Sequence, residues 1–285
     1  MYQSLECRPD SYQEWYQQGN QLRAEGYYQE ALTSYNRALD YYPRDYWTWY
    51  RKGIVFEALG CYADAISSYA QAIAIKPDNY WAWYDQGCIY FNEFSQYHQA
   101  IACFAQALVA RPQDYWATYR TGEAWRKLEQ YEQAISFYNQ ALEFRPQDFW
   151  AFYRRGEAQQ HWKKLDLALE SYDLALTIKP DDYWSWYQKG VVLQQLEQFS
   201  QAIDCFGQAL NLDAKSDAAW YQQACCYAQL KNTNWAITSL EKAIDLYPQK
   251  YLELAAHESV WLQFRQQIGF QSLLTNKSRK YQIDQ

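Results

Sequence analysis

The stretch DYWTWYRKG, residues 45–53, places four aromatic side chains within five consecutive positions. Aromatic crowding of this kind is costly in a soluble protein unless the rings have something to pack against. The stretch recurs with small changes as NYWAWYDQG (79–87), DYWATYRTG (114–122), DFWAFYRRG (148–156) and DYWSWYQKG (182–190). The fold therefore has to accommodate the same aromatic cluster at a regular interval.

Small residues share this interval of 34 residues, with one step of 35. The glycines are Gly19, Gly53, Gly87, Gly122, Gly156 and Gly190. Two alanine series run from Ala31 to Ala236 and from Ala38 to Ala243, and prolines from Pro43 to Pro248 close the units. A fixed period of this length predicts a solenoid of stacked helical units.

Each unit carries the signals of two helices. The residue before each predicted first helix is of an N-cap type, whose side-chain oxygen can accept a hydrogen bond from a free N–H group of the first turn. These residues are Ser11, Asp45, Asn79, Asp114, Asp148, Asp182 and Ser216. The proline two residues upstream ends the preceding helix. Bulky rings in the second helix, such as Tyr35 and Tyr69, are expected to fill the gaps beside the small residues.

The pattern resembles the tetratricopeptide repeat (TPR), in the long-array form known from bacteria. The residues that carry the resemblance in one unit are Trp49, Gly53, Phe56, Ala65, Tyr69, Ala72 and Pro77. The resemblance implies an all-α, right-handed TPR superhelix, an α-solenoid of about seven helix-turn-helix repeats. The units are 12–45, 46–79, 80–114, 115–148, 149–182, 183–216 and 217–250. They depart from the pattern at Thr118, at Ala224 and through one extra residue near 93–98.

Both ends of the array carry further predictions. Residues 1–11 are in phase with the repeats, because Pro9 lies 34 residues before Pro43. They are expected to form a stub, or to be the remnant of a longer array. Apolar residues at helical spacing predict a capping helix or helices at 251–274, since a solenoid end must cover its core. Residues 275–285 are expected to be a flexible tail.

Helical geometry divides the aromatic residues into two sets when each unit is numbered from its first helical residue. At 100° per residue, positions 1, 4, 8 and 11 share an arc of about 80°, and we interpret them as the seam against the second helix. Positions 2, 5 and 9 lie on a different arc. Position 2 is tryptophan in five units: Trp47, Trp81, Trp116, Trp150 and Trp184. Position 5 is tyrosine in all seven: Tyr16, Tyr50, Tyr84, Tyr119, Tyr153, Tyr187 and Tyr221.

In TPR proteins this second arc lines the concave groove that binds partners, so the resemblance implies a partner-binding groove here. Arginines beside the rings fit such a site, because a guanidinium can stack on a ring and still bind a carboxylate. The candidates are Arg51, Arg120, Arg126 and Arg154. Two alternatives stay open: the rings only pack between neighbouring repeats, and the arginines only pair with glutamates of successive repeats.

Composition limits the classes of function. With a net charge of −7, the chain lacks the excess of Lys and Arg that a nucleic-acid backbone requires. The seven cysteines have no CxxC spacing, which indicates free thiols in a reducing compartment and no zinc site. No apolar run approaches the roughly 18 residues that span a bilayer, and the start lacks a signal-peptide core. A cytoplasmic protein is expected, and peripheral association with a membrane complex is left open.

Catalytic signals are weak. The three histidines, His98, His161 and His257, lie far apart in the sequence, and G-x-S-x-G, HExxH and phosphate-binding glycine loops are missing. We therefore expect no catalytic residues, no metal site and no cofactor. The leading hypothesis is a non-enzymatic scaffold that binds a segment of another protein, as assembly factors and regulators of multi-subunit complexes do. The alternative is a small-molecule or glycan receptor that uses the rings as a stacking platform, while binding of single-stranded RNA is disfavoured by the acidic balance.

Overall fold

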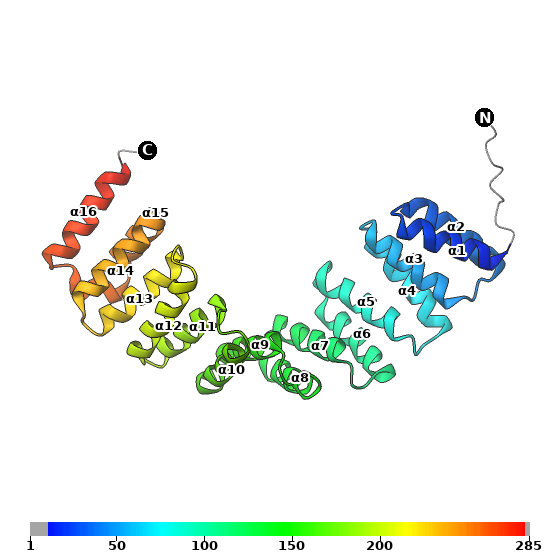
Figure 1. The fold of residues 1–285 in the computed structure, drawn as a ribbon, viewed down its shortest axis with the longest axis horizontal. Coiled ribbons are helices and arrows are strands. Elements are labelled where there is room, and N and C mark those ends of the chain that lie inside the picture. Colours follow the sequence, from blue (N-terminus) through cyan, green and yellow to red (C-terminus); the bar gives the residue numbers. More distant parts are fainter. Residues whose placement is uncertain (1–10, 283–285) are drawn as a thin grey trace. The chain divides into compact units, whose positions relative to one another are not determined.

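A computed structural model describes residues 11–282, which form consecutive pairs of antiparallel helices and contain no β-strand (Figure 1). The first helices of the pairs are α1 (Tyr12–Ala24), α3 (Tyr46–Ala58), α5 (Tyr80–Asn92), α7 (Tyr115–Lys127), α9 (Phe149–His161), α11 (Tyr183–Gln195) and α13 (Asp217–Gln229). The second helices are α2 (Tyr28–Tyr41), α4 (Tyr62–Ile75), α6 (Tyr97–Ala110), α8 (Tyr131–Phe144), α10 (Leu165–Ile178), α12 (Phe199–Leu212) and α14 (Thr233–Leu246). The expected all-α array of helix-turn-helix repeats is confirmed.

The chain divides into two compact units. Unit 1 ends at Phe144 and contains α1 to α8, and unit 2 begins at Arg145 and contains α9 to α16. Each first helix begins after an N-cap side chain that accepts a hydrogen bond from the backbone three residues later, as Asp45 does from the Thr48 N–H at 2.8 Å. This satisfies a donor that the first turn would otherwise leave free.

Glycine at position 8 allows the two helices of a repeat to pack closely. A Cβ atom built on Gly190 would lie 2.8 Å from Cε1 of Phe206, which is fully buried in the second helix. The same contact exists between the other position-8 glycines and the buried ring of their own repeat. In the seventh repeat Ala224 replaces the glycine, and the buried residue opposite is Leu240. The seam is therefore a matched pair of one small and one large residue.

Aromatic residues at two positions of the repeat make hydrogen bonds that connect consecutive repeats. At position 4, the indole N–H of Trp49 donates to the carbonyl of Pro43 at 2.9 Å, and Trp83 and Trp186 repeat this contact with Pro77 and Pro180. At position 1, the hydroxyl of Tyr80 donates at 2.8 Å to Asp114, the N-cap of the next repeat. The seam rings thus have structural roles, as the helical geometry predicts.

The C-terminal segment corrects one expectation. After α14 come α15 (Pro248–His257), the 3-10 helix η1 (Ser259–Phe264) and α16 (Ile268–Gln282). Trp261 of η1 is fully buried, as a cap requires. The flexible tail expected at 275–285 is wrong for residues 275–282, because Lys277 of α16 forms ion pairs with Glu241 and Asp245 of α14 at 3.0 and 2.6 Å. Residues 1–10, with Cys7 and most of the expected stub, and 283–285 lie outside the described residues.

None of the helices in residues 11–282 is both long enough and apolar enough to cross a membrane.

Candidate functional site

The five tryptophans at position 2 are exposed in both units. In unit 1 the exposed fractions of Trp47, Trp81 and Trp116 are 37, 42 and 48%. In unit 2 those of Trp150 and Trp184 are 55 and 59%. We call these sets the tryptophan rows of units 1 and 2. Large apolar side chains of this exposure are unusual unless something covers them, which makes the rows the candidate site.

The ring that precedes each tryptophan holds it in place. Tyr80 lies edge-to-face against Trp81 with ring centroids 5.0 Å apart, and Phe149 and Trp150 show the same arrangement at the same distance. These are favourable geometries for aromatic pairs. Because the preceding ring belongs to the packed seam, each tryptophan is presented in a fixed orientation.

The tyrosines at position 5 lie deeper than the tryptophans. Tyr50 and Tyr153 are 8 and 6% exposed, whereas Tyr84, Tyr119 and Tyr187 are partly buried. The ring of Tyr50 lies 5.6 Å from that of Tyr69 in the second helix, and its hydroxyl donates to Asp85 of the next repeat at 2.8 Å. Their rings thus pack within and between repeats, and they expose less surface than the tryptophans of the rows.

Sequence reasoning missed a cation beside the rings. Arg111 places its guanidinium 4.4 Å from the ring centroid of Tyr80 and 4.9 Å from that of Trp81. Lys76 lies 4.7 Å from the ring of Tyr46 of the same repeat. Both precede the proline that closes a repeat, so a recurring basic residue before proline was the available signal. Stacked cations of this kind add a positive edge to an aromatic surface.

A pocket of about 290 Å³ opens between the first helices α9 and α11 of unit 2. Its lining residues are Trp150, Tyr153, Arg154, Asp182 and Trp184. It lies at the low end of the range for small-molecule sites, roughly 300 to 1,000 Å³. Its size therefore suits one side chain of a ligand better than a whole small molecule.

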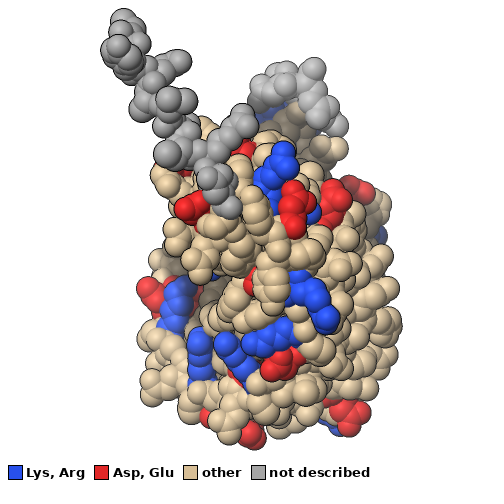
Figure 2. All heavy atoms as spheres, turned by 90° about the vertical axis from the view of Figure 1, so that its right-hand side faces the viewer, with Lys and Arg blue, Asp and Glu red and all other residues tan. Residues whose placement is uncertain are grey.

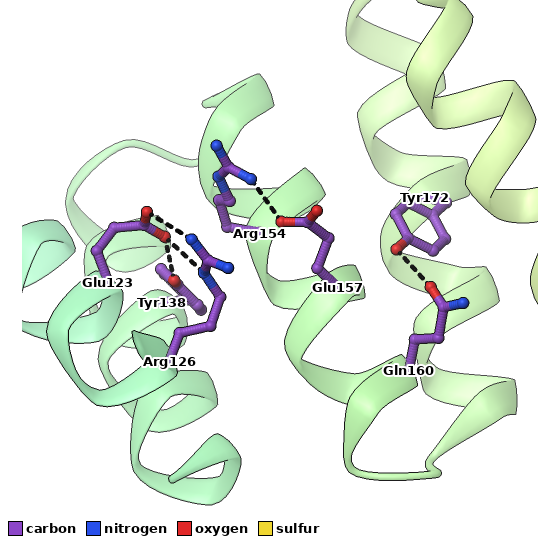
Figure 3. A network of polar contacts seen from close by, with 7 residues as sticks. All are labelled: Glu123, Arg126, Tyr138, Arg154, Glu157, Gln160 and Tyr172. Atoms are coloured by element: carbon purple, nitrogen blue, oxygen red, sulfur yellow. Dashed lines mark hydrogen bonds and ion pairs between the residues drawn. The ribbon is translucent and has the colours of Figure 1, made fainter. Parts of the chain in front are cut away.

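Two of the predicted arginines pair with a glutamate of their own helix (Figure 3). In α7, Glu123 accepts hydrogen bonds from Arg126 Nε at 3.2 Å and Nη2 at 3.1 Å, and the Tyr138 hydroxyl also donates to it. In α9, Arg154 Nη1 donates to Glu157 at 2.6 Å. These pairs span three residues of one helix, so they differ from the alternative of pairing between successive repeats.

Arg120 and Arg51 have different surroundings. The guanidinium of Arg120 lies 5.7 Å from the ring of Phe91. Arg51 is partly buried, and its Nε has no hydrogen-bond acceptor.

Two carboxylates lie in the same part of unit 1. Burial raises the pKa of Asp85 to about 6 and raises the pKa of Glu57 above its ordinary value.

The thiols are arranged as structural residues. The six cysteines in residues 11–282 are free, and Cys103, Cys205, Cys225 and Cys226 are buried. Burial raises the pKa of Cys205 to about 11 and that of Cys226 to about 12, so both stay protonated and unreactive at neutral pH. Within the described part of the chain, no group of His, Cys, Asp and Glu side chains could hold a metal ion.

Comparisons with known families place the chain in one of them. Profiles described as tetratricopeptide repeat or TPR repeat match residues 16–80, 122–161, 183–216 and 217–250, which is more than half of the chain. A profile for the protein prenyltransferase alpha subunit repeat also matches residues 165–196. No curated protein matches. The chain belongs to the tetratricopeptide repeat family, whose helical arrays serve as protein-interaction scaffolds.

Solved structures with the same fold include three instructive ones. The C-terminal part of a TPR repeat-containing protein from Cytophaga hutchinsonii is 17% identical with a TM-score of 0.71, over 84% of this chain and 98% of that one. A tetratricopeptide repeat protein from Parabacteroides merdae is 14% identical with a TM-score of 0.60, over 95 and 100%. YrrB, described as a TPR protein with an unusual peptide-binding site, is 23% identical with a TM-score of 0.58, over 66 and 96%.

Proposed function

We propose that the chain is a non-catalytic scaffold that binds an extended or helical segment of another protein along its tryptophan rows. The observation that carries the proposal is the exposure of all five position-2 tryptophans, at 37 to 59%. With about 250 Å² per side chain, each row exposes roughly 300 Å² of ring. A patch of this size reaches the range of the largest apolar patch on a typical monomer, which is often a binding site.

The surroundings of the rows support a protein ligand. The rings are held by the seam, so little side-chain freedom is lost when a partner binds. Aromatic rings with neighbouring arginines are the composition of binding hot spots. The pocket between Trp150 and Trp184 suits one inserted side chain, which favours a peptide over the small-molecule or glycan alternative. The peptide-binding site named for YrrB shows that a TPR array of this fold can bind peptides.

The finer role rests on the family resemblance alone. We extend the proposal to a cytoplasmic scaffold that acts in the assembly or regulation of a multi-subunit complex.

The test uses random peptides displayed at the N-terminus of a phage coat protein and selected on the full chain. The enriched peptides are then synthesised, and their affinities for Trp81→Ala and Trp184→Ala are measured. A row residue that anchors the peptide should cost about 2 kcal/mol of binding free energy or more, a loss of roughly 30-fold. The thermal midpoint should change little, because a half-exposed tryptophan stabilises the fold less than the 3 to 5 kcal/mol of a buried one.

The matched control is Trp235→Ala. Trp235 is 57% exposed, like Trp184, but it lies on a second helix and stacks on Tyr227. Its removal should leave peptide affinity unchanged. Peptides that bind both row variants as well as the wild type, or a loss of binding that only accompanies unfolding, would mean that the rows serve packing alone.

A further inference from the structure

The first helices differ at position 9 in a way that leaves two arginines without a carboxylate. In α7 and α9 this position holds Glu123 and Glu157, each of which pairs with an arginine of its own helix. In α1 and α3 the same position holds Asn20 and Ile54. The arginines of these two helices therefore lack the acidic partner that the later repeats provide.

The first repeat reproduces the arrangement around Glu123, except for the carboxylate. Arg23 of α1 corresponds to Arg126, and Tyr35 corresponds to Tyr138. The Tyr35 hydroxyl donates to the Asn20 side-chain oxygen at 2.9 Å, as Tyr138 does to Glu123. Nε of Arg126 donates to Glu123, whereas Nε of Arg23 is buried and has no acceptor.

Arg51 of α3 completes the cluster from the next repeat. It corresponds to Arg154, whose Nη1 donates to Glu157, whereas position 9 of α3 holds Ile54; Nε of Arg51, like that of Arg23, is buried without an acceptor. Both guanidinium groups lie near the Tyr35 hydroxyl: burial raises the pKa of Tyr35, and the charges of Arg23 and Arg51 oppose that shift. Within residues 11–282, neither arginine lies within ion-pair distance of a carboxylate.

Two carboxylates in the same part of unit 1 already have other donors. Glu57 accepts a hydrogen bond from the Tyr69 hydroxyl at 2.9 Å, and Asp85 accepts one from Tyr50 at 2.8 Å. Figure 2, which views the molecule from the side where α1 to α4 lie in Figure 1, shows several Lys and Arg side chains across the middle of that face, with Asp and Glu side chains beside some of them. A partly buried cation without a counter-ion is unfavourable, and an oxyanion from outside would relieve this.

We propose that Arg23 and Arg51, beside Asn20, form a subsite for the side-chain carboxylate of an Asp or Glu residue in the bound protein segment. The ligand carboxylate supplies the negative charge that Glu123 supplies in α7 and that Asn20, at the equivalent position, does not. The subsite rests on the proposed function, because it binds one residue of the segment that lies along the tryptophan row of unit 1. The charge complementarity indicates a peptide segment that carries at least one Asp or Glu side chain.

The experiment uses the same displayed peptide library, in which no peptide has a free C-terminus, so the only carboxylates are those of side chains. Selection on the full wild-type chain should enrich Asp and Glu relative to the starting library. Selection on Arg23→Gln/Arg51→Gln should not. The control Arg37→Gln/Lys242→Gln has the same net charge, but both residues are exposed on second helices, so its peptides should be as acidic as those of the wild type.

A double-mutant cycle then assigns the contact. Replacing the enriched Asp or Glu by Asn or Gln in a synthetic peptide should weaken binding to the wild type by about tenfold, as expected for the loss of a charge-assisted hydrogen bond. The same replacement should change the affinity for Arg23→Gln/Arg51→Gln by less than about twofold, because the interaction is already absent. The wild-type loss should also shrink at high salt.

A second variant tests the site without removing an arginine. Asn20→Glu supplies the carboxylate from within, as Glu123 does, and should raise the thermal midpoint while weakening acidic peptides about tenfold. Enrichment of peptides without an acidic bias, or an acidic bias that persists in Arg23→Gln/Arg51→Gln and Asn20→Glu, overturns the subsite and leaves the scaffold proposal standing. Failure of the wild type to enrich any peptide overturns the scaffold proposal and the subsite together.

Discussion

Exchanging Gly190 for alanine should expose the size matching that holds each repeat together. The added Cβ would lie 2.8 Å from Cε1 and 3.0 Å from Cδ1 of Phe206, closer than carbon atoms pack in a protein core. Phe206 is fully buried, so its ring can move only by displacing its neighbours. Overpacking of this kind costs about 1 to 3 kcal/mol, and we expect about 2 kcal/mol for Gly190→Ala.

The seventh repeat predicts which second change would relieve the clash. There Ala224 faces Leu240, and both are fully buried. Phe206→Leu alone should cost about 1 to 2 kcal/mol, because it removes buried ring atoms and leaves a cavity. In Gly190→Ala/Phe206→Leu the new methyl group occupies part of that cavity. The double variant should therefore be more stable than the sum of the single changes predicts, by about 1 kcal/mol or more.

The assay is denaturant unfolding followed by circular dichroism, with hydrogen exchange of α11 to α13 as a local readout. The local readout is needed because repeat arrays do not always unfold in one step. Gly190→Ala should reduce protection in α11 and α12, and Phe206→Leu should restore part of it. Strictly additive effects, or a Gly190→Ala variant as stable as the wild type, would refute the size-matching argument.

Two further predictions concern turns and buried charge. Lys231 has φ +57°, in the left-handed region that favours glycine, so Lys231→Gly should stabilise the chain by about 0.5 to 1 kcal/mol in a melting experiment. Gly60 lies at the equivalent turn with φ +72°, so Gly60→Ala should destabilise the chain by about 1 kcal/mol. Burial raises the pKa of Asp85 from 3.8 to about 6, so the native chain holds a proton that the unfolded chain has released, and the free energy of unfolding falls as the pH rises from about 4 to about 6. Asp85→Asn, which still accepts from Tyr50, should be more stable than the wild type at pH 7 by up to about 2 kcal/mol and lose this advantage at pH 4; an equal difference at both pH values would contradict the assignment.

Periodicity made most of the fold predictable. Glycine and alanine at fixed positions, N-cap residues such as Asp45 and the closing prolines are local signals, and each acts within one turn of chain. The extra residue near 93–98 also has the predicted effect, because the link between α5 and α6 is one residue longer than that between α3 and α4. The tail was misjudged because its helix is stabilised by Glu241 and Asp245 of α14, more than thirty residues away.

Helical geometry also separated the exposed tryptophans from the seam, since side-chain direction follows from residue number along a regular helix. Helical geometry could not predict how deeply each position-5 tyrosine is buried. Their burial depends on the ring of the second helix and on the next repeat, as in the contacts of Tyr50 with Tyr69 and Asp85.

The sequence by itself thus determined the helix pairs, the seam and the row of tryptophans, all of which follow from local spacing. Only the tertiary structure decided which charges are paired. Arg126 and Arg154 pair with a carboxylate on their own helix, whereas Arg23 and Arg51, from two repeats, both lie near the Tyr35 hydroxyl and pair with none in residues 11–282. The physical reason is that the surroundings of a charge on one helix also include side chains of neighbouring helices, at distances of a few ångströms that a repeat pattern does not specify.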